Sequence, residues 1–210
     1  MGNEKENINF LAKYLPENAV DYVYNQIVKH KILFKITKPR ATKLGDYMSP
    51  NNNRGHKITI NSNLNKYAFF LTFLHELAHL KVWEKYKNRV SAHGKQWISV
   101  YKDLIQKAID RGVFPVDLVR ILQKTMFSQN GIAGNYKTQI HKILENYDDE
   151  EKLRLDDIGT GHKITLRNGR QFIVLEKIRK RYKCKDVING KLYIVNHNAQ
   201  VVDFSTINDN

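Results

Sequence analysis

The chain has 210 residues, and its composition, 41% hydrophobic and 27% charged, indicates a globular protein and excludes long disordered or fibrous segments. Lys and Arg number 35 against 21 Asp and Glu, and the resulting formal net charge of +14 favours a polyanionic partner, nucleic acid first. The one cysteine excludes an intramolecular disulfide, and no apolar run approaches the about 18 residues of a membrane span. We therefore expect a soluble cytoplasmic protein with no membrane partner.

The sequence pattern of the first 150 residues predicts helices around a small sheet. Residues 6–30 have the apolar spacing of one or two helices. Three extended segments that can form a small sheet follow, at residues 31–37, 41–48 and 56–61. Apolar residues at helical spacing then predict four more helices, at about residues 66–86, 95–110, 114–124 and 137–147.

The composition changes near residue 150. Six of the 21 acidic residues lie within residues 148–157, and after residues 159–161 the pattern becomes that of β-strands. Asn189-Gly190 between two alternating runs is a strong hairpin signal. We expect a main domain over residues 1–152, an acidic linker over 153–160 and a small basic β domain over 161–210.

The helix predicted at residues 66–86 contains His75, Glu76 and His79 in the pattern H-E-x-x-H. On a helix, positions i and i+4 share a face, so both imidazoles can reach one metal ion. Glu76 can then act on a water molecule at the metal without being a ligand. The alternative is a pair of helix histidines that hydrogen-bond locally.

A catalytic zinc site needs a third protein ligand, and His93 is the best candidate. It lies 14 residues after His79, beyond the end of the predicted helix, and Gly94 follows it. A glycine there allows a sharp turn or a close backbone approach.

Residues 75–97, with His75, Glu76, His79, His93, Gly94 and Trp97 in their order and spacing, resemble the SprT-like metalloprotease family. The resemblance extends over about residues 20–112. It implies an α+β, zincin-like core of helices and a small sheet, one zinc ion held by His75, His79 and His93, and Glu76 as general base. The family includes Spartan, a DNA-stimulated protease of proteins crosslinked to DNA, so the resemblance also implies a role in DNA repair.

The C-terminal region departs from the family pattern. Many members have a four-cysteine zinc ribbon there, whereas this region has only Cys184. We therefore expect no second, structural zinc ion. A ribbon-like or small-barrel shape held by packing is expected instead, with Cys184 in its core.

A basic run in this region is a candidate nucleic-acid interface. On a single strand, Lys177, Arg179, Arg181, Lys183 and Lys185 would share one face and could follow a phosphate backbone. The alternative is a solvated face of an edge strand.

These features favour a zinc metallopeptidase acting on protein or peptide substrates, including proteins associated with DNA. A second hypothesis is a nucleic-acid-binding protein whose zinc site is structural. A third is a protease of ordinary cytoplasmic proteins whose basic charge is incidental.

Overall fold

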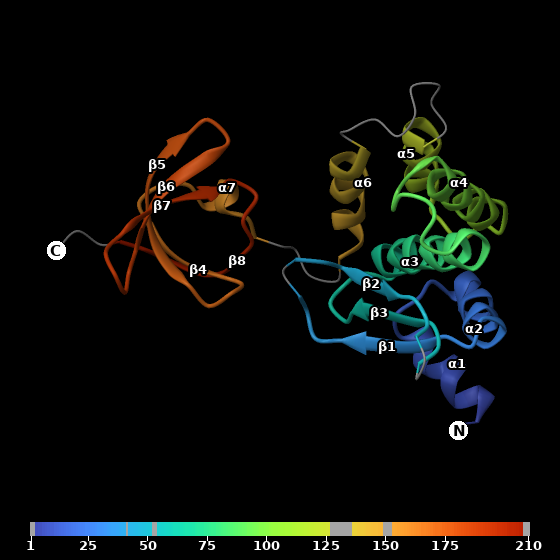
Figure 1. Cartoon of the computed structure of the whole chain (residues 1–210). Helices are drawn as coiled ribbons and strands as arrows, with labels where there is room; N and C mark the ends of the chain where they lie inside the picture. Colours follow the sequence, from blue (N-terminus) through green and yellow to red (C-terminus); the bar gives the residue numbers. More distant parts are fainter. Residues whose placement is uncertain (1–2, 41, 52–53, 127–135, 149–152, 208–210) are drawn as a thin grey trace. The chain divides into compact units, whose positions relative to one another are not determined.

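The computed structural model describes residues 3–40, 42–51, 54–126, 136–148 and 153–207. The chain divides into two compact units, Met1–Asp148 and Asp149–Asn210, each with its own hydrophobic core (Figure 1). The predicted domain boundary at residue 152 lies outside the described residues. None of the helices in the described ranges is both long enough and apolar enough to cross a bilayer.

The first unit combines helices with a three-stranded sheet of order β1-β3-β2, so the predicted α+β class is confirmed. Strand β1 runs parallel to β3, and β2 runs antiparallel to it. The elements in chain order are α1 (Glu4–Ala12), η1 (Glu17–Ala19), α2 (Val20–Lys29), β1 (Leu33–Thr37), β2 (Gly45–Met48), β3 (Lys57–Asn61), α3 (Lys66–Tyr86), α4 (Lys95–Asp110), α5 (Val116–Met126), α6 (Tyr136–Leu144) and η2 (Glu145–Tyr147).

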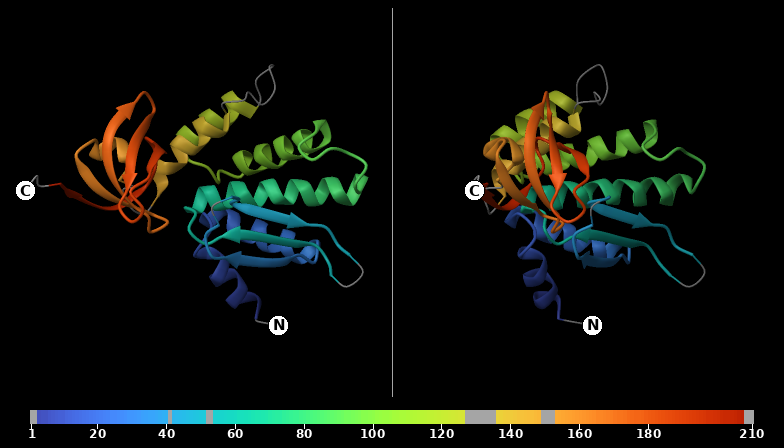
Figure 2. Two further views of the ribbon diagram at one scale, coloured as in Figure 1. Left: turned by 60° about the vertical axis from the view of Figure 1, so that its left-hand side comes forward. Right: turned by 90° about the vertical axis from the view of Figure 1, so that its left-hand side faces the viewer.

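Helix α3 is the centre of the first unit. Figure 2 shows it between the sheet and α4, and it packs on β2, β3 and α4. A helix covered on several sides needs apolar residues around most of its circumference. Accordingly, the stretch from Phe69 to Leu74 is buried throughout, as are Leu77, Ala78 and Leu80. A polar side chain that lies among these residues, such as Glu76, is therefore part of the core of the unit.

Asn65 fixes the start of α3 and joins it to the end of the first unit. Its Oδ1 accepts a hydrogen bond from the Ala68 backbone N–H at 2.9 Å, which caps the helix. Its Nδ2 donates to the Leu144 carbonyl at 2.7 Å and to Asp148 Oδ1 at 2.8 Å. One side chain thus connects the helix that carries the histidines to the last residues of the unit.

The second unit is an antiparallel sheet of order β7-β6-β5-β4-β8, so the predicted all-β appendage is confirmed. Its elements are α7 (Leu155–Ile158), β4 (His162–Leu166), β5 (Gln171–Ile178), β6 (Arg181–Asp186), β7 (Leu192–Asn196) and β8 (Val201–Thr206). Cys184 is fully buried in its core, as expected, and burial raises the pKa of its thiol to about 11. The linker prediction for residues 153–160 is corrected, because this segment forms α7 and its Leu155 is fully buried in the same core.

Asp156 connects α7 to the sheet. Its Oδ1 accepts hydrogen bonds from Lys177 Nζ and from the Tyr182 hydroxyl, and His197 Nδ1 lies 3.5 Å from its Oδ2. These bonds, with the Lys177 bond contributing most, lower the pKa of Asp156 from 3.8 to about 2.

Replacing Asp156 with Asn is therefore expected to lower the melting temperature of the second unit at pH 7. A depressed folded-state pKa means that the stabilisation is present above the unfolded pKa of 3.8 and is lost as the pH falls toward about 2. Calorimetry of both proteins between pH 7 and pH 2 checks this. A difference in melting temperature that does not shrink below pH 4 would contradict the role of the ionised carboxylate.

Candidate metal centre

Three histidines converge at one point of the first unit. His75 and His79 lie one turn apart on α3, and His93 comes from the loop before α4. Their Nε2 atoms are 3.3 Å (His75 to His79), 3.1 Å (His79 to His93) and 3.1 Å (His75 to His93) apart. A neutral imidazole has one N–H, so three nitrogens in mutual contact cannot all be satisfied by one another. The three nitrogens surround a common point, as the ligands of a metal ion do.

This donor set fits zinc. Four-coordinate zinc with Zn–N bonds of about 2.0–2.1 Å places its ligand nitrogens about 3.3 Å apart, close to the separations observed. Burial, and next the neighbouring His93, lower the pKa of His79 to about 4. Its ring is therefore neutral at pH 7, which is the form that binds a metal.

The backbone of His93 is in the left-handed region, with φ at +60°. Residues other than glycine adopt this conformation at a cost of roughly 1–2 kcal/mol, and such residues concentrate at functional sites. The conformation allows a residue outside α3 to place its imidazole beside the two helix histidines. The sequence predicts His93 as a ligand, but nothing in the sequence predicts its left-handed backbone conformation.

Glu76, which follows His75 on α3, is buried, with 7% of its surface exposed. The backbone N–H of Tyr47, on β2, donates a hydrogen bond to its carboxylate. Burial, and next the charge of Asp46, raise the pKa of Glu76 to about 7. A carboxyl group with this pKa can both accept and release a proton near neutral pH.

Gly45 lets strand β2 approach Glu76 closely. A Cβ atom at this position would lie 2.8 Å from Glu76 Oε1 and 2.6 Å from Thr72 Cγ2. Both distances are shorter than real Cβ contacts, so any side chain here would displace the strand or the carboxylate. Sequence reasoning missed this residue, because the contact is between elements that are distant along the chain.

Trp97, on α4, contacts all three histidine rings. Its ring centroid lies 4.6 Å from that of His75, 5.3 Å from that of His79 and 4.7 Å from that of His93. Tyr101 stacks on the Trp97 ring at 4.7 Å, and Trp97 is 3% exposed. The indole is therefore part of the core and also fixes the orientation of the three imidazoles.

A hollow of about 260 Å³ adjoins the histidines, and its lining includes His79, Trp97 and Tyr47. The Tyr47 hydroxyl lies 2.9 Å from His56 Nδ1, and the Tyr47 ring is nearly parallel to that of His79. Burial, and next the charge of Glu84, raise the pKa of Tyr47 above its usual value. Its hydroxyl thus stays protonated and can donate a hydrogen bond beside the histidines.

The basic run of the second unit is placed differently from the prediction. The pairing of Ile178 with Arg181 makes residues 179–180 a two-residue turn, and Arg179 has φ at +53°. The cations therefore belong to two strands and a turn, and the single-strand arrangement is wrong. Lys177 lies on the face of the sheet that carries the buried Tyr182, and it pairs with Asp156. Arg181, Lys183 and Lys185 lie on the opposite face of the sheet.

Comparison with known proteins identifies one family. The model of the SprT-like family matches residues 12–117, about half of the chain. This span contains all three strands of the first sheet, the three histidines and Glu76. No curated protein and no solved structure was found to match the chain.

Proposed function

The chain belongs to the SprT-like family, and from this premise we propose that it is a zinc-dependent metallopeptidase that hydrolyses peptide bonds of protein substrates. The observation that carries the proposal is the convergence of three imidazole nitrogens, together with a buried glutamate that follows His75 on the same helix. That combination is the chemical apparatus of a metallohydrolase.

In this proposal His75, His79 and His93 hold the metal and Glu76 moves the proton. A bound Zn²⁺ supplies a Lewis acid and lowers the pKa of a coordinated water to about 7. Glu76 accepts a proton at its carboxylate and delivers it to the leaving amine, for which a pKa of about 7 is suited. The Tyr47 N–H and the close approach of β2 at Gly45 hold the carboxylate in place during both transfers.

The number of ligands favours a catalytic site over a structural one. Structural zinc sites are closed by four protein ligands, whereas catalytic sites use three and leave one position for water or substrate. Within the described ranges, the cluster able to hold a metal consists of the three histidines alone. The hypothesis of a nucleic-acid-binding protein with a structural zinc site is therefore the second candidate.

The substrates that we propose are proteins associated with DNA, including proteins crosslinked to it. Two observations support this choice. The formal net charge of +14 favours contact with a polyanion, and the residues of the metal centre resemble those of a family that contains a DNA-stimulated protease. The cytoplasmic location expected from the sequence remains part of this proposal.

The test measures zinc content and proteolysis together. The chain is loaded with zinc, and cleavage of a DNA-binding protein is followed with and without single-stranded DNA. The same assay is applied to His93→Ala and to the matched control His141→Ala, which changes an exposed histidine on α6. We expect one zinc ion per chain, cleavage that a chelator abolishes, and a zinc affinity reduced more than about a hundredfold in His93→Ala alone.

The outcomes separate the candidates. Zinc-dependent cleavage that increases with DNA supports the full proposal. Zinc-dependent cleavage without an effect of DNA supports the peptidase and contradicts the DNA-associated substrates. DNA binding without cleavage favours the structural-zinc alternative, and full zinc content in His93→Ala contradicts the assignment of the third ligand.

A further inference from the structure

The positive charge of the chain is concentrated in the first unit. Residues 1–148 contain 23 Lys and Arg against 12 Asp and Glu, a net charge of +11. Residues 149–210 contain 12 against 9, a net charge of +3. A polyanion attracted by the charge of the chain would therefore meet its strongest field at the first unit.

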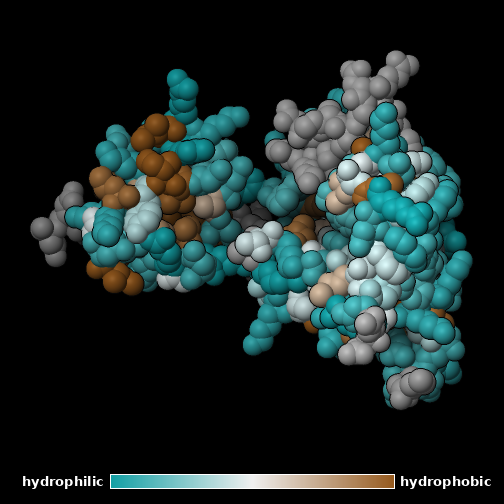
Figure 3. Space-filling view, in the orientation of Figure 1, coloured by the Kyte–Doolittle hydropathy of each residue, from teal (hydrophilic) through white to brown (hydrophobic). Residues whose placement is uncertain are grey.

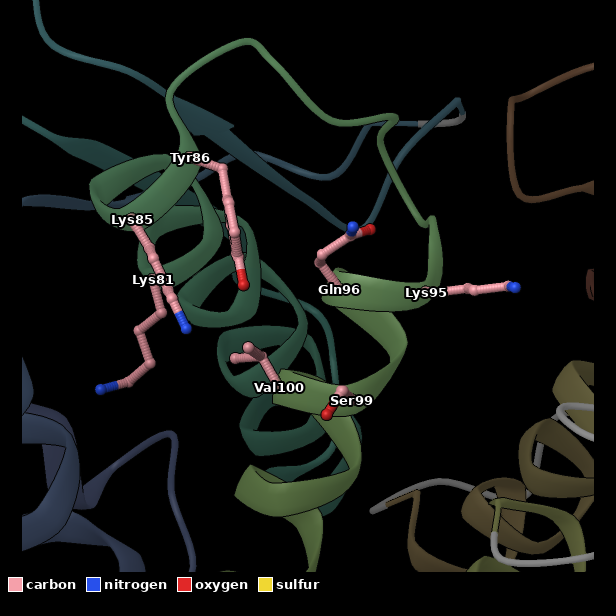
Figure 4. Close-up of a pocket in the computed structure, with 7 residues that line it drawn as sticks. All are labelled: Lys81, Lys85, Tyr86, Lys95, Gln96, Ser99 and Val100. Atoms are coloured by element: carbon pink, nitrogen blue, oxygen red, sulfur yellow. The ribbon is translucent and has the colours of Figure 1, made fainter.

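Within the first unit, the ends of α3 and α4 that flank His93 enclose a basic hollow of about 340 Å³, here called the α3–α4 groove. Figure 4 shows Lys81 and Lys85 on its α3 side, Lys95 pointing outward from the start of α4, and Tyr86 between the two helices. The remaining lining residues, Gln96, Ser99 and Val100, come from α4. The cations thus flank the groove on two sides, an arrangement suited to a ligand with several negative charges.

The lysines of the groove are not engaged in ion pairs in the described part of the chain. No carboxylate lines the groove, and neither Lys81, Lys85 nor Lys95 forms an ion pair there. The nearby acids have other partners, because Asp103 pairs with Lys107 and Glu84 pairs with His30. The positive charge of the groove is therefore available to an external anion.

The electrostatic surroundings of the groove are unfavourable without such an anion. Lys95 stands in the first turn of α4, where the helix dipole disfavours a cation. A bound anion would offset this unfavourable interaction.

The predicted basic face of the second unit is less suited to this role. Lys177 pairs with Asp156, and Lys183 pairs with Glu176 at 2.9 Å. On the face of Arg181 and Lys185, the neighbouring strand β7 places the exposed apolar residues Leu192 and Ile194. Figure 3 shows apolar side chains gathered on the visible surface of this unit.

We infer that the α3–α4 groove binds single-stranded nucleic acid, with Lys81, Lys85 and Lys95 contacting phosphates and Tyr86 stacking on a base. A basic groove that contains an aromatic side chain is the common arrangement for binding single-stranded nucleic acid. An acidic protein, the alternative ligand, would need the cations but no aromatic side chain. The inference rests on the nucleic-acid part of the proposed function and is independent of the peptidase part.

The test is an anisotropy titration of a labelled oligothymidylate of about 15 nucleotides, near the upper end of common site sizes, at several salt concentrations. The groove variant is Lys81→Gln/Lys85→Gln/Lys95→Gln. Two variants with the same loss of charge serve as controls, Arg181→Gln/Lys183→Gln/Lys185→Gln in the second unit and Lys5→Gln/Lys13→Gln/Lys124→Gln elsewhere on the first. Tyr86→Leu and Tyr86→Phe test the stacking.

We expect the groove variant alone to make the slope of log K against log salt shallower by about 2, because three phosphate contacts to a single strand are lost. Tyr86→Leu is expected to weaken binding on the order of tenfold, and Tyr86→Phe to bind like the wild type. Equal losses of oligonucleotide affinity in all three charge variants would overturn the inference. A loss of affinity confined to the second-unit variant would also overturn it. Competition by polyglutamate as strong as by unlabelled oligothymidylate would also overturn it, in favour of an acidic protein.

Zinc content and peptide cleavage are measured on the same samples. Failure of oligonucleotide binding in a zinc-loaded, proteolytically active chain rejects the groove and leaves the peptidase. Oligonucleotide binding at the groove in a chain that cleaves nothing rejects the peptidase and leaves the groove.

Discussion

Replacing Glu76 with Gln is expected to leave one zinc ion bound per chain and to lower the rate of peptide hydrolysis by about 10²- to 10⁴-fold, the usual contribution of a general base. The amide has nearly the same size, and its oxygen can still accept the hydrogen bond from the Tyr47 N–H. What it cannot do is accept the proton of the attacking water. Parallel measurements of zinc content and of kcat on a peptide substrate separate the loss of the base from the loss of the metal.

The matched control is Glu17→Gln, which removes the same charge from an exposed position in η1. We expect this control to retain wild-type kcat. Glu76→Gln with full activity would exclude Glu76 as the base, and Glu76→Gln without zinc would show that the residue maintains the metal centre instead.

Replacing Gly45 with Ala is expected to lower kcat about a hundredfold with zinc still bound. The new methyl group would lie 2.8 Å from Glu76 Oε1, so the carboxylate or strand β2 has to move. A displacement of about 1 Å in a catalytic group is enough for a loss of this size. Measurement of kcat and KM separately checks the prediction, because a displaced base lowers kcat, whereas a damaged substrate surface raises KM.

Two further variants distinguish this positioning role from simple loss of stability. Gly55→Ala is the matched control, since its Cβ would meet only the Lys31 carbonyl oxygen at 3.7 Å, an ordinary contact. In Gly45→Ala/Thr72→Ser, the clash with Thr72 Cγ2 is removed while the clash with Glu76 remains. We expect the double variant to regain melting temperature but not kcat. Recovery of both would show that Gly45 matters only for packing.

The local parts of the fold were predictable from the sequence. Helices α3 and α4 begin and end at the residues expected, because long apolar periodicity and clear interruptions mark both. The three histidines and Glu76 could be named for a similar reason. Two of the histidines and Glu76 lie within about one helical turn, and the third lies in the loop between α3 and α4.

Features that depend on contacts between distant segments were not predictable. The run at residues 177–185 contains no Gly, Pro or Asn, so nothing in the sequence indicates the turn at residues 179–180. The close approach of Gly45 to Glu76 and the contact of Trp97 with three imidazoles depend on how β2 and α4 pack on α3. Sequence patterns describe single elements, whereas these contacts are properties of their arrangement.

The bonds of Asn65 indicate how far the unit that carries the three histidines extends along the chain. The match to the family ends at residue 117, but the amide of Asn65, which begins the histidine-bearing helix, is bound to Leu144 and Asp148. Leu122, Met126 and Ile140, also beyond the match, are buried in the same core. A fragment cut at the family limit would thus expose apolar surface and leave the helix cap without two of its partners. The smallest fragment that keeps the three histidines together with their whole core therefore ends at residue 148, about 30 residues after the family match ends.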